Sequence, residues 1–495
     1  MSTQLRASRW PQSGFTAGVF LLAAVGLAGC GGGGEDSTVG YVTVPGGTPT
    51  RIVINSPAQI AQVSADNYDD NVNGVISGTT LMRWIDDWAT NRPAGITGRL
   101  IILQVSNGPA GNEYITPNPA GGVLTYSVPS SRLTMSRSNG VTTTRSMVPD
   151  GAAMDAFLSD YGIDPTKDML VCAMGAGSTG AAMSMGRCWY MLRYWGVEAN
   201  HLAQLNGGAN SALVMDPAYR GPTASCDENT MLTPTPAADC LPHSGYISVR
   251  GLPQDNTALQ ATLSDVIDLV EGRTSAFLWD ARSTGQYLGA PMSAGIFQNQ
   301  SSRQGHPKGA YVLEYTNLLM GDGSWRYKDK ADLQAYLDGD TVDGNQFGYY
   351  DAGAVIPLGT GNAYQGGTIV TYCETTFRAM ITGTAAGVIL GKPVRYYDGA
   401  MVEWNAMTGD SVVVTSTNAP ILPANSPWRT DTPVRSVYNY STLTIAPRQI
   451  DDPYWEADKA RPRADAIILA DKNYKRGGGG DDIGGAVLPP SPCGG

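Results

Sequence analysis

The feature that most constrains the fold of this chain is one order of elements that occurs twice along it. Each time, a short buried strand leads through a loop into a helix, and the next strand ends at an Asn-Gly or Asp-Gly turn. The expected strands are 169–172, 201–205, 368–372 and 393–397, and the helices between them are 181–195 and 377–390. Parallel strands joined through a helix need a crossover connection, so we expect an α/β fold of two similar units in tandem.

The domain organisation follows from these units and from the composition around them. With 495 residues, 42% of them hydrophobic, the chain can form large cores, and 61 Gly and 31 Pro predict many turns. Both units are expected to be doubly wound with parallel sheets, and the first carries an insertion near 104–148. We expect a signal peptide at 1–29, a tether at 30–60, the first unit at 61–215, a linker loop at 216–255, the second unit at 256–408, an irregular C-terminal extension at 409–475 and a disordered tail at 476–495.

The first thirty residues resemble a bacterial lipoprotein signal. Arg6 and Arg9 precede an apolar run that ends in Leu27-Ala28-Gly29-Cys30, an order typical of cleavage before Cys30 and lipidation of its thiol. Gly rather than Asp follows the cysteine, which in lipoproteins implies the outer membrane of a Gram-negative bacterium. We expect a lipid-anchored protein of the cell envelope that faces the periplasm and has no transmembrane helix. The alternative is an ordinary cleaved signal in which Cys30 is incidental.

The charge and the histidine content exclude several classes of protein. The chain has 33 basic and 44 acidic residues, and removal of residues 1–29 takes away two arginines, so the formal charge becomes 31 − 44 = −13. Such a surface repels phosphate backbones, and we expect no nucleic-acid partner. Only three histidines occur, at positions 201, 243 and 306. A zinc site with several histidines and a c-type haem are therefore not expected.

One disulfide can be proposed from the cysteine positions. An exported protein can form disulfides, and Cys226 and Cys240 flank a single Pro/Thr-rich loop, which makes them the best pair. Spacing alone does not assign the other cysteines.

The segment from residue 69 to residue 80 has the spacing of a calcium loop. Asp69, Asn71 and Asn73 stand at the first three ligand positions, and Gly74 stands at the sixth. Thr80 occupies the place of the usual bidentate Glu. A structural calcium site and a turn without metal therefore both remain open.

A glycine-rich loop over 175–180 matches the spacing of dinucleotide-binding loops, since it follows a strand and precedes a helix. The next strand ends at Asn206, however, and no acidic residue is placed there to bind a ribose. We interpret the loop as the counterpart, in the first unit, of a catalytic loop in the second.

The residues that carry chemistry follow the strand at 368–372. Cys373 stands at the carboxyl end of this strand and opens a helix, with Arg378 close behind it. Loop amides, the helix dipole and the arginine all favour a thiolate and stabilise an anionic adduct on it. A thiolate that takes up a sulfane sulfur as a persulfide needs no metal, no histidine base and no cofactor. The alternative is a buried structural cysteine.

At this point the chain resembles a known family, the two-domain rhodanese sulfurtransferases. Four stretches of the second unit match in order: Asp280-Ala281-Arg282, Gly305-His306-Pro307-Lys308-Gly309-Ala310, Cys373 to Arg378, and Val394 to Gly399 with Glu403-Trp404. The resemblance implies that Cys373 is the nucleophile and that Arg378 and the loop residues Glu374, Thr375, Thr376 and Phe377 surround the transferred sulfur. It also implies that Arg282 holds the donor anion, and that Asp280 and His306 support the loop. The first unit resembles the inactive N-terminal repeat and is expected to be scaffold.

Loop length and loop composition then narrow the chemistry. Four residues separate Cys373 from Arg378, as in the sulfurtransferases, whereas the related phosphatases have five. Thr376 stands where the family usually has Gly, and Glu374 is acidic, which weakens the binding of a dianionic donor. Leu288 stands where mercaptopyruvate-type members have a second arginine. A persulfide, polysulfide or selenium donor therefore remains possible.

Two functions remain open on the sequence alone. The first is a sulfurtransferase that moves sulfur from a small donor to a thiol, or to cyanide in an assay. The second is a non-catalytic accessory lipoprotein that uses the same fold to bind a protein partner in an envelope or respiratory complex. A sulfur atom trapped on Cys373 would distinguish between them.

Overall fold

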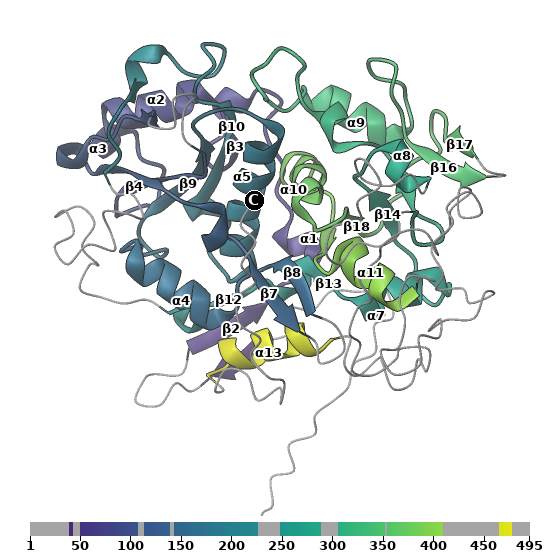
Figure 1. Ribbon diagram of the computed structural model, residues 1–495. Coiled ribbons are helices and arrows are strands. Elements are labelled where there is room, and N and C mark those ends of the chain that lie inside the picture. Colours follow the sequence, from purple (N-terminus) through teal and green to yellow (C-terminus); the bar gives the residue numbers. More distant parts are fainter. Residues whose placement is uncertain are drawn as a thin grey trace, which may run out of the picture. The chain divides into compact units, whose positions relative to one another are not determined.

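The computed structural model describes residues 39–42, 50–106, 113–138, 143–225, 248–288, 305–351, 354–408 and 465–477 (Figure 1). Several expectations therefore lie outside the described residues. They are the signal peptide with Cys30, the pair Cys226 and Cys240 with most of the linker loop between the two units, residues 409–464 of the C-terminal extension, and nearly all of the tail at 476–495.

The first sheet has five strands, all parallel. They lie in the order β3 (Gly74–Ile76), β10 (Leu202–Gly208), β9 (Met169–Met174), β4 (Leu100–Gln104) and β6 (Val123–Ser127). All five residues of β4 are buried, as expected of a parallel strand that is covered on both faces. The sheet is accompanied by α2 (Gly78–Asp86), α3 (Trp88–Asn91), α4 (Gly151–Asp160) and α5 (Thr179–Tyr194).

The second sheet repeats this arrangement. Its parallel part runs β13 (Gln260–Ala261), β19 (Val394–Tyr397), β18 (Ile369–Tyr372), β14 (Phe277–Asp280) and β15 (Tyr311–Val312), and an antiparallel hairpin of β16 (Gly348–Asp351) and β17 (Ala354–Pro357) extends it. Numbered in chain order, the parallel strands of both sheets lie as 1-5-4-2-3. The helices of this unit are α7 (Leu263–Val270), α8 (Thr284–Tyr287), α9 (Lys330–Asp338), α10 (Phe377–Gly383) and α11 (Ala400–Thr408). The expected α/β class with two doubly wound sheets is confirmed.

Three hydrophobic clusters show how the layers pack. One cluster covers one face of the first sheet and contains residues of α2 and alternate residues of β9. Another covers one face of the second sheet and contains residues of α7 and α11 and alternate residues of β18. The third and largest cluster takes the other face of both sheets, together with α5 and α10. Tyr190 from α5 and Tyr396 from β19 meet there with ring centroids 4.7 Å apart. The two units therefore share one core, and α5 and α10 lie side by side in it (Figure 1).

Close approach of α5 and α10 depends on a glycine. A Cβ atom built on Gly186 of α5 would lie 2.7 Å from the Cβ atom of Met380 on α10. No larger residue fits at this position without moving one of the helices.

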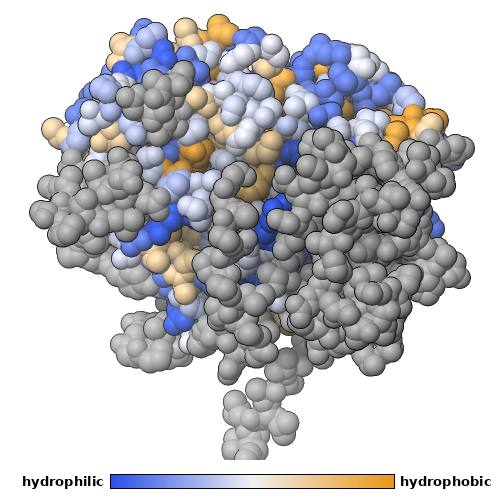
Figure 2. Space-filling view, viewed as in Figure 1, coloured by the Kyte–Doolittle hydropathy of each residue, from blue (hydrophilic) through white to orange (hydrophobic). Residues whose placement is uncertain are grey.

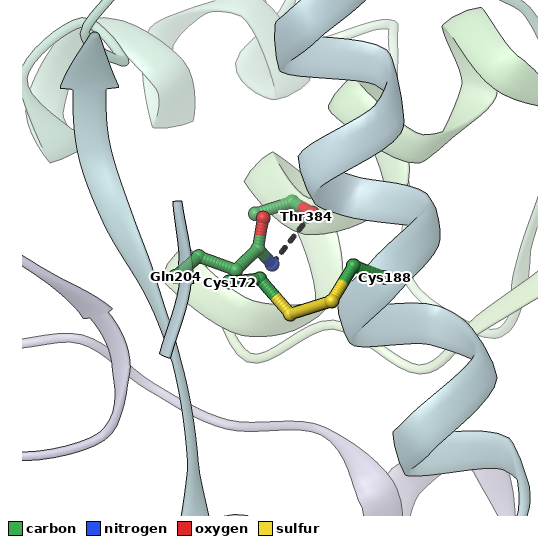
Figure 3. The surroundings of a disulfide bond; sticks show 4 residues. All are labelled: Cys172, Cys188, Gln204 and Thr384. Atoms are coloured by element: carbon green, nitrogen blue, oxygen red, sulfur yellow. Dashed lines mark hydrogen bonds between the residues drawn. A yellow bond between two sulfur atoms is a disulfide. The ribbon is translucent and has the colours of Figure 1, made fainter. Parts of the chain in front are cut away.

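One disulfide is present in the described part of the chain, between Cys172 on β9 and Cys188 on α5 (Figure 3). Their Cα atoms are 6.1 Å apart and both residues are fully buried. Beside the disulfide, Gln204 of β10 donates a hydrogen bond of 3.2 Å to Thr384 of the second unit. The sequence did not assign this pair, because 16 residues separate its cysteines and only the fold brings them together.

Several segments differ from the sequence expectations because their pairing is non-local. Within the expected tether, β1 (Val39–Val42) and β2 (Thr50–Ile54) form a sheet with β12 (Gln254–Asp255). Within the expected insertion, β6 completes the first sheet, β7 (Met135–Ser138) pairs with β8 (Thr143–Met147), and β5 (Tyr114–Ile115) pairs with β11 (Arg220–Gly221). Within the expected irregular extension, Ala466–Lys475 form the helix α13, which packs against α4.

The helix at 377–390 begins as expected but changes type. After α10, residues Thr384–Ile389 continue as a π-helical turn. The short helix α1 (Pro57–Ile60) precedes the first unit. None of the described helices is long and apolar enough to cross a membrane. On the face shown in Figure 2, the described residues intermix hydrophilic and hydrophobic side chains.

Candidate functional site

The candidate site lies where β14 and β18 end side by side. These strands are parallel and in register, with Asp280 opposite Tyr372. The backbone N–H of Ala281 donates a 2.9 Å hydrogen bond to the carbonyl of Tyr372. Carboxyl ends of adjacent parallel strands meet at one edge of a sheet, where loops form sites. The sheet therefore brings Arg282 next to the loop that begins at Cys373.

Cys373 follows β18 and belongs to the core shared by both units. It is 1% exposed, and among the described residues it is the cysteine that forms no disulfide. Its carbonyl accepts a 3.1 Å hydrogen bond from the N–H of Met401, and the carbonyl of Glu374 accepts one of 3.2 Å from Val402. The first turn of α11 thus holds the beginning of the loop.

Thr376 fixes the other end of the loop. Its φ of +67° is left-handed, a conformation that is rare and strained for a β-branched residue. The side chain is fully buried, and its hydroxyl lies 2.9 Å from the carbonyl oxygen of Tyr397 and 3.0 Å from that of Asp398. Threonine can occupy this position because these contacts with the end of β19 offset the strain.

Arg282 is buried within a group of carboxylates. Its Nε donates a 2.9 Å hydrogen bond to one oxygen of Asp280, and Nη2 donates one of 2.6 Å to the other and a further one to the carbonyl of Gly305. Nη1 lies 3.6 Å from Glu374. Burial opposes the charge, but Asp280 more than offsets this and raises the pKa of Arg282 above its usual value. The expected role in holding a donor anion is thus not visible here, because Asp280 and Glu374 already compensate the charge.

Arg378 stands in the first turn of α10 and is only partly buried. It donates a hydrogen bond to the side-chain carbonyl of Gln286 on α8. Because its contact there is a neutral amide, its positive charge remains for an anion at the loop. Gln286 was not recognised from the sequence, since nothing in its neighbours indicates which helix faces the loop.

Tyr315 is a second residue that the sequence did not indicate. Its backbone N–H donates a 3.1 Å hydrogen bond to the carbonyl of Ala281, which places it beside the end of β14. Burial raises the pKa of its phenol, the charge of Arg378 and a hydrogen bond with Thr179 lower it, and Glu314 and Cys373 raise it further. The phenol therefore stays protonated at neutral pH, and Arg378 and Cys373 are among the groups that act on its pKa.

His306 packs inside the fold. Its Nδ1 lies 2.8 Å from the carbonyl oxygen of Tyr287, and its ring stacks on the Tyr287 ring with centroids 3.7 Å apart. Burial lowers the pKa of His306 to about 4. The imidazole is therefore neutral at physiological pH and supports the turn whose Gly305 carbonyl contacts Arg282.

The expected calcium ligands lie far from this loop in sequence and take part in local hydrogen bonds. The side chain of Asn71 accepts a 2.9 Å bond from the N–H of Ala65 and donates one of 2.6 Å to the carbonyl of Val75. Asn73 accepts a 3.4 Å bond from Gln62, and the Asp69 carbonyl accepts one from Thr80. Within the described residues there is no group of three or more His, Cys, Asp or Glu arranged for a metal. Calcium binding remains a prediction.

The glycine-rich loop of the first unit follows β9, the counterpart of β18. Its Gly177 donates a 2.9 Å hydrogen bond to the side chain of Asn210. A Cβ atom on Gly177 would lie 2.4 Å from the indole of Trp325, which belongs to the second unit. The side chains of Asn210 and Trp325 therefore pack against this loop.

No family model matches the chain, and no curated protein matches it. Some solved structures do. The Tum1 protein from Saccharomyces cerevisiae is 17% identical over 68% of this chain and 95% of its own, with a TM-score of 0.44. YnjE is 16% identical over 67% and 66%, with a TM-score of 0.44. The anaerobic ergothioneine biosynthesis enzyme from Chlorobium limicola, in complex with trimethyl histidine, is 13% identical over 67% and 68%, also at 0.44.

These comparisons correct the family assignment made from the sequence. The assignment to the two-domain rhodanese family, as a lipoprotein member, is wrong, because neither a family model nor a curated relative matches the chain. Four short motifs in the right order describe loops and turns, and they do not by themselves define a family.

Proposed function

We propose that this protein is an enzyme that transfers sulfur through a persulfide on Cys373. The observation that carries the proposal is the placement of Cys373, a free cysteine at the carboxyl end of a central parallel strand, with Arg378 in the first turn of the helix that follows. Two independent anchors, α11 at the start of the loop and β19 at its end, hold this cysteine in place. A purely structural cysteine does not require such anchoring.

The chemistry needs two substitutions at sulfur. In the first, the Cys373 thiolate attacks the sulfane sulfur of a donor R–S–SH; a new S–S bond forms, the donor S–S bond breaks, and R–S⁻ leaves with the bonding electron pair. In the second, an acceptor thiolate or cyanide attacks the outer sulfur of the deprotonated persulfide. The Cys373 thiolate then leaves, with thiocyanate as the product when cyanide is the acceptor. Both steps balance without an external oxidant or reductant.

The charges around the loop favour one class of donor. Asp280 and Glu374 together carry one negative charge more than Arg282 compensates, and Arg378 is the remaining cation among the described residues that the loop presents. The four groups therefore sum to zero. A site with this balance favours a neutral or singly charged donor, such as a persulfide or hydropolysulfide, over the thiosulfate dianion.

The test is peptide-level mass spectrometry after treatment of the whole chain with hydropolysulfide, glutathione persulfide or thiosulfate. We expect a gain of one sulfur atom on the peptide that contains Cys373, and its loss, with formation of thiocyanate, on addition of cyanide. Cys373→Ser serves as the control and should show neither. If the folded wild-type chain takes up no sulfur from any of these donors, the catalytic proposal is wrong and a partner-binding role replaces it.

We further propose that the chain is held at the outer membrane by lipid on Cys30. The support is the order of the N-terminal residues, from Arg6 through the apolar run to Leu27-Ala28-Gly29-Cys30. Growth with an alkyne-labelled fatty acid should label the wild-type chain but not Cys30→Ser. An unlabelled wild-type chain would refute lipidation.

A further inference from the structure

The first unit lacks a cysteine in its own loop, yet its helix α5 contacts the Cys373 loop of the second unit. Arg187 is fully buried and lies on α5, the helix that packs against α10 (Figure 1). Its guanidinium carbon lies 5.9 Å from the centroid of the Phe377 ring, within cation–π range. Phe377 is the residue before Arg378, so this contact reaches the catalytic loop directly.

A second connection runs from Arg187 to the loop through Asp398. Nη1 of Arg187 donates a 2.6 Å hydrogen bond to one carboxylate oxygen of Asp398, and Nη2 donates one of 3.2 Å to the other. Both side chains have no exposed surface. A bidentate pair of this kind fixes both position and orientation of the carboxylate.

Asp398, whose position Arg187 fixes, contacts the Cys373 loop through Thr376. Its backbone carbonyl is one of the two that lie within hydrogen-bond distance of the Thr376 hydroxyl, at 3.0 Å. Its carboxylate also accepts a 2.6 Å hydrogen bond from the N–H of Val148, a residue of the first unit. The first unit therefore fixes the end of β19 through the Asp398 carboxylate. The same residue contacts Thr376, which has the left-handed conformation, through its backbone carbonyl.

The disulfide anchors the helix from which this chain of contacts starts. Cys188 is adjacent to Arg187 in sequence, and its bond to Cys172 ties α5 to the first sheet (Figure 3). The helical turn that carries Arg187 is thus covalently linked to the first sheet.

We propose that Arg187 is a positioning residue for Cys373: it holds Thr376 through Asp398 and contacts Phe377 directly, so that the first unit shapes the loop of the second. This inference rests on the proposed function, because it concerns the same cysteine. It also changes the role expected for the first unit, which becomes a part of the site and not only a scaffold.

The chain offers a matched control in Arg137 and Asp471. This pair is also buried and bidentate, with distances of 2.7 and 2.6 Å, and it joins β7 to α13. Asp471 also accepts a 2.7 Å hydrogen bond from Tyr194, which lies on α5 seven residues after Arg187. Arg137→Met therefore breaks a buried ion pair of the same kind that also borders α5, while the Arg187–Asp398 pair itself is left in place.

The experiment compares wild type, Arg187→Met, Arg187→Lys, Asp398→Asn and Arg137→Met as whole chains. Two rates are measured on the Cys373 peptide: sulfur uptake from hydropolysulfide, and alkylation by iodoacetamide under native conditions. We expect both rates to change at least tenfold in Arg187→Met and Asp398→Asn, with sulfur uptake falling. Arg187→Lys, which keeps the charge, should recover part of the uptake, and Arg137→Met should stay within twofold of wild type.

If Arg187→Met takes up sulfur within twofold of wild type, or if Arg137→Met is equally impaired, the positioning role is refuted. If Arg187→Met does not fold, Thr376→Val tests the same connection at its loop end, and unchanged rates in that variant refute it. If wild type takes up no sulfur, the proposed function fails, but the alkylation rates still decide whether Arg187 positions Cys373.

Discussion

Acidification should destabilise this protein through one buried histidine. Burial lowers the pKa of His306 to about 4, from an ordinary value of 6.5. The unfolded chain therefore binds a proton at this residue between pH 6.5 and 4, while the folded chain does not. The stability that this difference contributes is fully present above pH 6.5 and is lost as the pH falls toward 4.

The size of the effect follows from the two pKa values. Each unit of difference corresponds to about 1.36 kcal/mol, so the full difference is worth about 3 kcal/mol. The linkage relation predicts that the folded state loses about 2 kcal/mol between pH 7 and pH 5 from this group alone. That is a large share of the stability of a typical domain.

The assay is urea unfolding of wild type and His306→Gln at pH 7, 6 and 5. The substitution removes the ring that stacks on Tyr287, so the variant should be less stable than wild type at pH 7. The difference between the two proteins should shrink by about 2 kcal/mol at pH 5, because only wild type carries the titrating imidazole. Carboxylates that titrate in both proteins cancel in this difference. A difference that stays constant from pH 7 to pH 5 would refute the argument.

Three further predictions concern single residues. Burial lowers the pKa of Lys475 to about 8, although its ammonium lies 2.9 Å from two backbone carbonyl oxygens. The stability of wild type should therefore rise between pH 8 and 10.5, by an amount of order 3 kcal/mol, and Lys475→Met should abolish that rise in denaturant titrations. Thr376→Val keeps the side-chain shape but leaves two buried carbonyls without the hydroxyl, so thermal unfolding should show a loss of about 1–3 kcal/mol. Thr376→Gly should lose less, because glycine relieves the left-handed strain; a larger loss for glycine contradicts this reading. Finally, Glu374→Gln removes a negative charge beside Cys373 and should raise the rate of sulfur uptake from thiosulfate severalfold relative to that from hydropolysulfide. An unchanged ratio of the two rates would show that this carboxylate does not select the donor.

Much of the local structure around Cys373 could be predicted because its parts are contiguous. The strand, the cysteine, the arginine and the helix occupy residues 369–383 without interruption, and apolar runs together with loop residues suffice to locate them. The neighbouring strand β14 ends in Asp280, the first residue of the motif Asp280-Ala281-Arg282. Its place beside β18 depends on the order of the strands in the sheet, which the sequence did not predict.

The strands of the expected insertion show what a local pattern leaves out. β6 reads as a short apolar run among turn residues, and its membership of the first sheet depends on pairing with β4. The family assignment failed for a related reason, since short motifs describe a loop and two turns but not a whole chain.

The sequence by itself determined the α/β class, the two units and the cysteine at the end of a strand. These depend on the spacing of apolar residues along short stretches, which burial of one or both faces of an element dictates. Only the tertiary structure decided which arginine side chains are paired with a carboxylate and which can act on an anion at the Cys373 loop. Arg282 is compensated within its own strand end, whereas Arg187 meets Asp398 across 211 positions of sequence. Such partners cannot be read from spacing, because a buried charge is stable only beside a partner that the packing of distant elements supplies.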